Sequence, residues 1–140
     1  MNNLRTMSTL VLAMMVSACG DDGTSLDTVG LEGTWRASAI VYTSAGNSQN
    51  QVDIVQRDGA SFTLTVDAEG TATSVFVDGV GGTSSDSGTL DASATTLTLG
   101  GRTFDADRDG DVLTLVDPDA QFDFGTGSEV AATLHIVLRR

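Results

Sequence analysis

The chain has 140 residues and a formal net charge of −12 at pH 7, with 19 acidic residues, 7 arginines and no lysine. This charge disfavours nucleic acid and anionic lipid headgroups as partners, because both would repel the protein. The length suits one domain, and the single cysteine excludes a disulfide bond within the chain.

The N-terminal segment predicts export. Residues 1–6 carry one positive charge at Arg5, residues 7–16 form an apolar run, and small residues follow. This is the pattern of a secretory signal peptide, and the apolar run is about half as long as a membrane-spanning helix requires. Residues 1–18 are therefore predicted to be removed as a signal peptide.

The four residues Val16, Ser17, Ala18 and Cys19 resemble the processing site of bacterial lipoproteins. The resemblance implies that a lipid is attached to the Cys19 sulfur and that the peptidase cuts before Cys19. Acyl chains such as palmitate would then anchor the new N-terminus in a membrane, and several chains anchor more firmly than one. The alternative is an ordinary signal peptide cut after Ala18, which would leave an unpaired exported thiol.

Residues 19–30 are small and acidic and are predicted to form a flexible tether between the lipid and the domain. In the enterobacterial sorting rule, an aspartate directly after the cysteine retains a lipoprotein in the inner membrane. Gly20 occupies that position, and Asp21 comes next. The resemblance therefore implies outer-membrane delivery if the cell has two membranes.

From residue 31 onward, alternating or short apolar runs are separated by clusters of Gly, Asp and Ser, which indicates strands and hairpins. Loops are predicted at 44–50 and 117–128, and 79–88 is predicted to be a loop with a weak strand in its second half. Two strands should each have one apolar face. In the first strand this face is Trp35, Ala37, Ala39 and Val41, and in the last strand it is Val130, Ala132, Leu134, Ile136 and Leu138. The clear strands are predicted at 33–43, 51–57, 61–67, 71–78, 95–99, 102–106, 112–116 and 129–139.

About eight or nine strands with mostly tight connections predict antiparallel neighbours. An up-and-down meander of this kind closes into a barrel because closure removes exposed strand edges. The expected fold is therefore all-β, an eight-stranded barrel or a flattened barrel-like sandwich.

The first predicted strand opens with LEGTW at residues 31–35, which resembles the Gly-x-Trp opening of lipocalin-like barrels at Gly33 and Trp35. The rhythm of FTLTVDAEGTAT and TFDADRDGDVLTL is also similar to small bacterial lipocalin-like lipoproteins. In that family a basic residue near the C-terminal strand packs over the tryptophan, and Arg139 is the best-placed match. The resemblance implies that residues 31–140 form a barrel that binds a small apolar ligand or an envelope protein.

The acid-rich segment at residues 105–111 (DADRDGD) has the spaced carboxylates and the sixth-position glycine of a calcium loop. Its twelfth position is Val116 instead of a carboxylate, and Arg108 would oppose a cation. The favoured interpretation is a hairpin that turns at Asp109 and Gly110. A weak calcium site is the alternative.

No pattern in the sequence marks an enzyme. His135, the only histidine, falls on the outward face of the last strand, and no activated serine motif is available to pair with it. Residues 79–82 (GVGG) lack the helix and the lysine of a phosphate-binding loop. One histidine and no free cysteine leave few zinc ligands. We expect no catalytic residues, cofactor or metal, and an enzyme that uses converging aspartates is the weakest hypothesis.

Phe122 and Phe124, in the predicted loop at 117–128, are the candidate ligand-mouth residues. They would form an apolar lid over the mouth of a binding barrel, or they would plug the open end of the core. The lid fits a membrane-anchored binding lipoprotein. The plug fits a filled barrel that serves as a structural protein or as an inhibitor of an exported enzyme.

Overall fold

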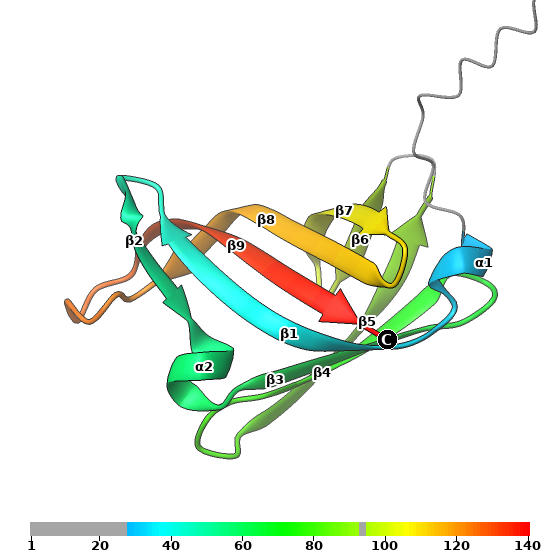
Figure 1. The fold of residues 1–140 in the computed structure, drawn as a ribbon, viewed down its shortest axis with the longest axis horizontal. Coiled ribbons are helices and arrows are strands. Elements are labelled where there is room, and N and C mark those ends of the chain that lie inside the picture. Colours follow the sequence, from blue (N-terminus) through cyan, green and yellow to red (C-terminus); the bar gives the residue numbers. More distant parts are fainter. Residues whose placement is uncertain (1–27, 93–94) are drawn as a thin grey trace, which may run out of the picture.

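The computed structural model describes residues 28–92 and 95–140, which form a β-barrel with two short helices (Figure 1). The predicted signal peptide, Cys19 and most of the predicted tether lie outside the described residues, so their roles stay predictions. The last residues of the predicted tether, 28–30, lie in helix α1 (Thr28–Leu31), whose final residue Leu31 is buried in the core. None of the described helices is long and apolar enough to cross a membrane.

Strands account for nearly all of the remaining secondary structure, and helix α2 (Ile54–Asp58) separates the second and third of them. The strands are β1 (Gly33–Ser44), β2 (Asn47–Asp53), β3 (Ser61–Val66), β4 (Thr71–Val77), β5 (Thr83–Asp91), β6 (Thr96–Leu99), β7 (Arg102–Asp109), β8 (Val112–Phe122) and β9 (Val130–Arg139).

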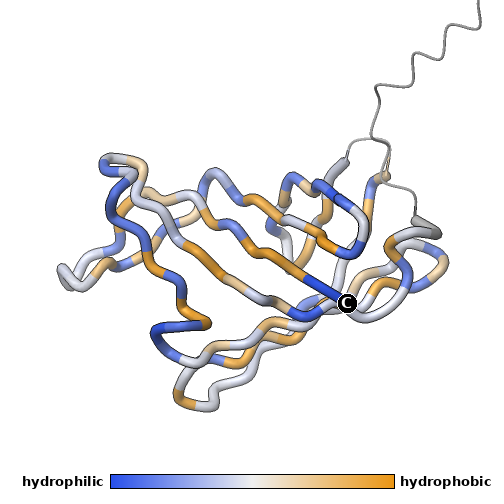
Figure 2. Tube along the Cα trace, viewed as in Figure 1, coloured by the Kyte–Doolittle hydropathy of each residue, from blue (hydrophilic) through white to orange (hydrophobic). Residues whose placement is uncertain are grey.

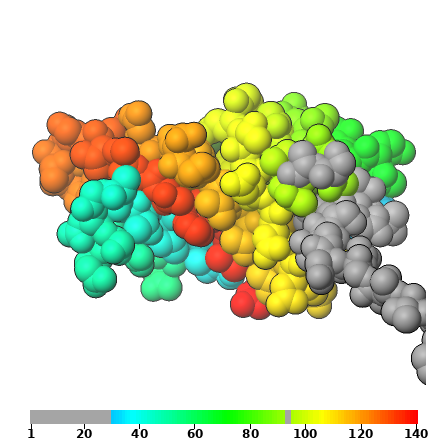
Figure 3. Space-filling model, turned by 90° about the horizontal axis from the view of Figure 1, so that it is seen from above, coloured from blue at the N-terminus to red at the C-terminus, as the bar shows by residue number. Residues whose placement is uncertain are grey.

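The strands lie in the order β2-β1-β3-β4-β5-β6-β7-β8-β9, and every pair is antiparallel. A further pairing of β1 with β9 closes eight of them into a barrel, and β2 remains as an extra strand beside the C-terminal part of β1. Closure can be followed in Figure 3, where β9 runs diagonally across the face between β1 and β8. The predicted all-β, up-and-down barrel is thus confirmed.

Apolar and polar residues alternate along β9 (Figure 2), and this alternation decides which of its side chains face the core. Its inward residues are buried as predicted, except that Val130 at the strand start is 42 % exposed. The buried residues are Ala132, Leu134, Ile136 and Leu138. A strand with one buried face specifies its register strongly, because a shift by one residue would expose the whole apolar set.

The apolar face of β1 differs from the prediction. Trp35 and Ala37 face the core, but a bulge follows, in which Ala37 pairs with Leu138 and Ala39 pairs with the adjacent Val137. The extra residue moves the following side chains to the opposite faces. The inward residues are therefore Ile40 and Tyr42 in place of Ala39 and Val41.

The predicted strand at 51–57 is wrong in its second half, which forms α2. Asp53 caps the helix, because its Oδ1 accepts a hydrogen bond from the Val55 amide at 2.9 Å. Gly59 ends the helix with a φ of 72°, a conformation that favours glycine. Ile54 is buried, so the helix is held against the barrel by apolar packing.

Two predicted loops are shorter than expected. β2 begins at Asn47, inside the predicted loop at 44–50, and β8 continues through the start of the predicted loop at 117–128 to Phe122. Pro118 lies in an irregular part of β8, between Asp117 and Ala120, where the pairing with β9 shifts. Proline is tolerated there because no ladder hydrogen bond has to come from its nitrogen.

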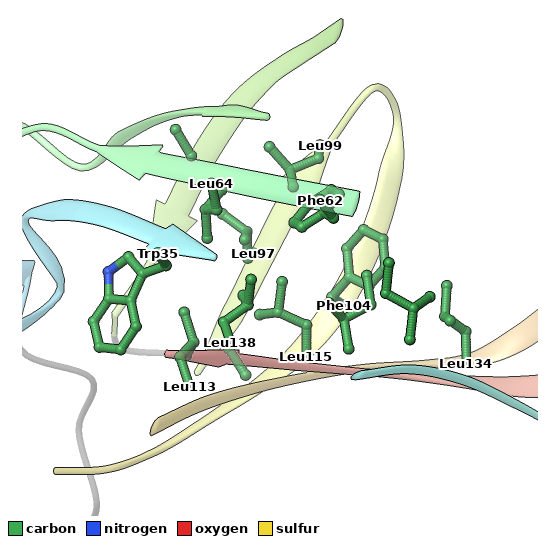
Figure 4. Close-up of a cluster of buried hydrophobic side chains, with 14 of the residues drawn as sticks. Trp35, Phe62, Leu64, Leu97, Leu99, Phe104, Leu113, Leu115, Leu134 and Leu138 are labelled. Atoms are coloured by element: carbon green, nitrogen blue, oxygen red, sulfur yellow. The ribbon is translucent and has the colours of Figure 1, made fainter. Parts of the chain in front are cut away.

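The core is densest in the half of the barrel near Trp35. Leucines from opposite walls converge there, as Figure 4 shows for Leu64, Leu97, Leu113 and Leu138. Each of these side chains is at most 2 % exposed. Among the described residues, apolar side chains therefore pack against one another across this half of the barrel, which is usual for an eight-stranded barrel.

Candidate ligand site at the open end of the barrel

The end of the barrel next to α1 is closed. Trp35 is fully buried there, and its indole Nε1 donates a hydrogen bond to the Leu31 carbonyl at 2.8 Å. The guanidinium carbons of Arg140 and Arg108 lie 4.7 Å and 5.9 Å from the centre of the indole ring. Cations at these distances are attracted to the ring face. Among the described residues, the indole and the two guanidinium groups therefore cover this end of the barrel.

The arginine nearest the tryptophan is Arg140, whereas the prediction chose Arg139. Arg139 is exposed on β9, because the neighbouring Leu138 takes the inward position. Arg140 follows the end of the strand, and its Nη1 donates to the Glu32 carbonyl at 3.2 Å. Arg140, two residues after the inward Leu138, thus folds back over the barrel end.

The opposite end contains a cavity of about 230 Å³. Its wall combines aliphatic and aromatic side chains with a small set of hydroxyl and charged groups. The lining residues are Ile40, Tyr42, Phe62, Ser74, Phe76, Ser84, Asp86, Leu99, Arg102, Phe104, Leu134 and Ile136. An apolar cavity with a few convergent polar groups is the usual form of a small-molecule site.

Small and polar residues on β4 and β5 explain the hollow. Across the sheet, Leu64 pairs with Ser74, and Ser74 pairs with Asp86. In the row nearer the open end, Phe76 pairs with Ser84. Ser74 is buried although it is polar, and it occupies a position where a larger apolar residue would fill the barrel. The cavity therefore follows from the identity of a few inward residues on two strands.

A charged pair lies beside the cavity. The Nη2 of Arg102 is 2.6 Å from the Oδ2 of Asp117, which is buried, and the Asp119 amide donates to the other carboxylate oxygen at 3.0 Å. Burial raises the pKa of the nearby Tyr42 phenol; Arg102 opposes this shift, and Asp117 and Glu129 add to it. The phenol is therefore protonated at neutral pH and remains a hydrogen-bond donor.

The predicted mouth residues form an aromatic cluster at the rim. Phe122 stacks on Tyr42 with ring centres 4.2 Å apart, and Phe124 meets Phe122 edge-on at 5.0 Å. The guanidinium carbon of Arg57 lies 5.5 Å from the centre of the Phe122 ring. Neither phenylalanine lines the cavity, so the cluster adjoins it through Tyr42.

The other residues considered in the sequence lie apart from the cavity. His135 faces outward on β9, between Val41 on β1 and Val116 on β8. The segment at 105–111 is a hairpin, because β7 ends at Asp109, which pairs with Val112. Among the residues that the structure describes, no group of three or more His, Cys, Asp or Glu side chains is arranged to hold a metal ion.

Sequence reasoning missed the polar side of the cavity. Ser74, Ser84 and Asp86 were in predicted strand or weak-strand segments, and Arg102 began a predicted strand. The available signal was the polar pair Ser84 and Asp86 at alternate positions of β5, together with Ser74 between Ala72 and Phe76 on the inward face of β4, where a filled barrel would carry larger apolar side chains.

No protein-family model matches the sequence, and no curated protein matches it. Among solved structures, a lipocalin lipoprotein affecting virulence in Streptococcus pneumoniae matches with a TM-score of 0.50 and 19 % sequence identity. The match covers 79 % of this chain and 91 % of the other. It agrees with the closed eight-stranded barrel. The described part of the chain therefore has a lipocalin-like fold.

Proposed function

We propose that this protein is an exported, lipid-anchored binding protein that holds a small, largely apolar ligand in the open half of its barrel. The observation that carries the proposal is the 230 Å³ cavity, whose wall is mostly apolar and includes a protonated phenol and two serine hydroxyls. Binding is favoured over catalysis, because the described residues bring no histidine to the cavity.

The anchoring part of the proposal rests on residues 16–19 and their resemblance to a lipoprotein processing site. It is supported by the similar structure, which is that of a lipoprotein. A lipid at Cys19 would tie the barrel to a membrane and leave its cavity free to exchange ligand with the surrounding space. The proposal extends to export and anchoring and leaves open which membrane carries the protein.

Native mass spectrometry of the lipidated protein, taken from its own cell envelope in mild neutral detergent, tests the binding function. We expect a reproducible small-molecule adduct that disappears on unfolding. A bare protein mass would favour the second candidate, a protein partner bound by the loops. That candidate is supported by Val80, which is 94 % exposed in the loop between β4 and β5, beside the cavity residues Phe76 and Ser84.

A further inference from the structure

The charged groups around the cavity identify the class of ligand, if the proposed binding function is correct. Asp86 and Arg102 are the two charged residues in the cavity wall. Arg102 already has a carboxylate partner in Asp117, 2.6 Å away. The Asp86 carboxylate makes no hydrogen bond or ion pair with another of the residues described here. The group available to a ligand is therefore an anion.

Arg57, the other arginine near this end of the barrel, is also paired with a carboxylate. Arg57, above the Phe122 ring, binds Asp58 through two hydrogen bonds, from Nε to Oδ1 at 2.7 Å and from Nη2 to Oδ2 at 2.6 Å. Arg57 and Arg102 are thus each neutralised by an aspartate. An anionic ligand would have to compete with these aspartates and would approach a chain of net charge −12.

The carboxylate of Asp86 lies against the Gly100 backbone, in the turn between β6 and β7. Gly100 has a φ of 56°, and a Cβ atom added there would collide with the carboxylate oxygen Oδ1. Any other residue at this position would displace the Asp86 side chain. The turn therefore leaves room for the carboxylate beside the cavity.

The remaining wall suits the body of an organic cation. Tyr42, Phe62, Phe76 and Phe104 are aromatic, and aromatic ring faces attract ammonium groups as well as apolar chains. At about 30 Å³ per water-sized group, a volume of 230 Å³ accommodates roughly eight heavy atoms. This is below the range of about 300–1,000 Å³ that is typical of sites for drug-sized ligands.

We infer that the cavity binds a small primary amine of at most about eight heavy atoms in all, whose ammonium group pairs with Asp86 while its apolar body occupies the space lined by aromatic residues. The inference rests on the proposed binding function and adds the sign of the ligand charge. If the inference is right, the cavity must prefer an amine to an alcohol of the same length. An apolar cavity without a charged group would bind the two equally well.

The test compares hexylamine, hexanol and hexanoate by isothermal titration of the lipidated protein in neutral detergent, at low ionic strength and pH 7. We expect hexylamine to bind about fivefold more tightly than hexanol, the upper range for an exposed ion pair, and hexanoate to bind most weakly. Asp86→Asn should remove the preference for the amine and retain hexanol binding, which also shows that the variant is folded.

The matched control is Asp107→Asn, which makes the same change of charge on the outward face of β7. It should bind all three compounds as the unmodified protein does. Equal or weaker binding of hexylamine relative to hexanol, or a preference for the amine that survives Asp86→Asn, would overturn the inference and leave the binding function standing. Failure of all three compounds to bind would count against the proposed function itself.

Discussion

Ser74 is a buried polar residue in the wall of a barrel whose neighbouring rows carry large apolar side chains. It pairs with Leu64 on one side and with Asp86 on the other, so it lies where the filled half of the barrel gives way to the cavity. The size of the cavity therefore depends on the small volume of the Ser74 side chain, while the hydroxyl group adds a polar contact to its wall. A serine in place of a leucine leaves two fewer side-chain heavy atoms in the barrel interior and adds a hydroxyl group.

Ser74→Leu should narrow the cavity and weaken ligand binding. The larger side chain enters space that is already hollow, so we expect unfolding free energy to stay equal or rise by about 1 kcal/mol through apolar burial. Native mass spectrometry would follow the adduct, and chemical denaturation the stability. Thr73→Leu is the matched control, because Thr73 is exposed on the same strand. An adduct retained at the level of the parent protein in Ser74→Leu would show that the ligand lies elsewhere.

Arg139 and Arg140, at the end of β9, should contribute differently to the free energy of unfolding. Arg140→Ala removes a guanidinium 4.7 Å from the Trp35 ring centre and its hydrogen bond to Glu32, and it should lower the unfolding free energy by about 1 kcal/mol. Arg139→Ala changes an exposed side chain on the outer face and should stay within about 0.5 kcal/mol of the parent. Urea denaturation of the two variants distinguishes the two residues, and a larger loss in Arg139→Ala would contradict the assignment.

At the scale of elements, sequence reasoning succeeded where a strand alternates without interruption and failed where an extra residue interrupts it. β9 has its inward residues where alternation predicts them. In β1 the bulge after Ala37 exchanges the faces, and nothing in the local composition marks it, because Ser38 fits a regular strand equally well. The bulge is required by pairing with β9, which is distant in the sequence.

Helix α2 escaped prediction for a related reason. Residues 51–57 alternate well enough for a strand, and five residues are too few to show a helical period. The local signals were Asp53 as N-cap and Gly59 as C-cap. The cavity was not predicted, because Phe122 and Phe124 do not line it and its polar wall depends on register between β3, β4 and β5.

Asp53→Ala should loosen α2 and the adjoining part of β1. The Oδ1 atom of Asp53 accepts hydrogen bonds from the Val55 amide at 2.9 Å and the Ile40 amide at 3.3 Å. Loss of such a cap lowers unfolding free energy by about 1–2 kcal/mol. Asp58→Ala, at the other end of the helix, should leave stability nearly unchanged because Asp58 is exposed. Hydrogen exchange should rise in residues 54–58 of Asp53→Ala alone, and unchanged protection there would contradict the capping role.

At the scale of the whole molecule, the barrel is divided into a filled half and a hollow half. The filled half contains Trp35 and the converging leucines, and it supplies the stability that a chain without a disulfide has to obtain from packing. The hollow half contributes less to stability, because a cavity takes the place of apolar side chains that would otherwise pack there. This division lets one small domain be stable and still contain a cavity.

The lipid anchor would decide where this domain works. We expect the parent protein to incorporate radiolabelled palmitate and to sediment with membranes, because Cys19 follows the residues that a lipoprotein processing site requires. Cys19→Ser should lose the label, since a hydroxyl cannot replace the thiol as the acceptor. Ser17→Ala keeps a small residue before the cysteine and should be labelled as the parent is. An unlabelled parent protein with a mature N-terminus at Cys19 and a titratable thiol would instead establish an ordinary signal peptide. In that case the barrel would be free in its compartment, and the ligand site would be unaffected, because its lining residues all lie between Ile40 and Ile136.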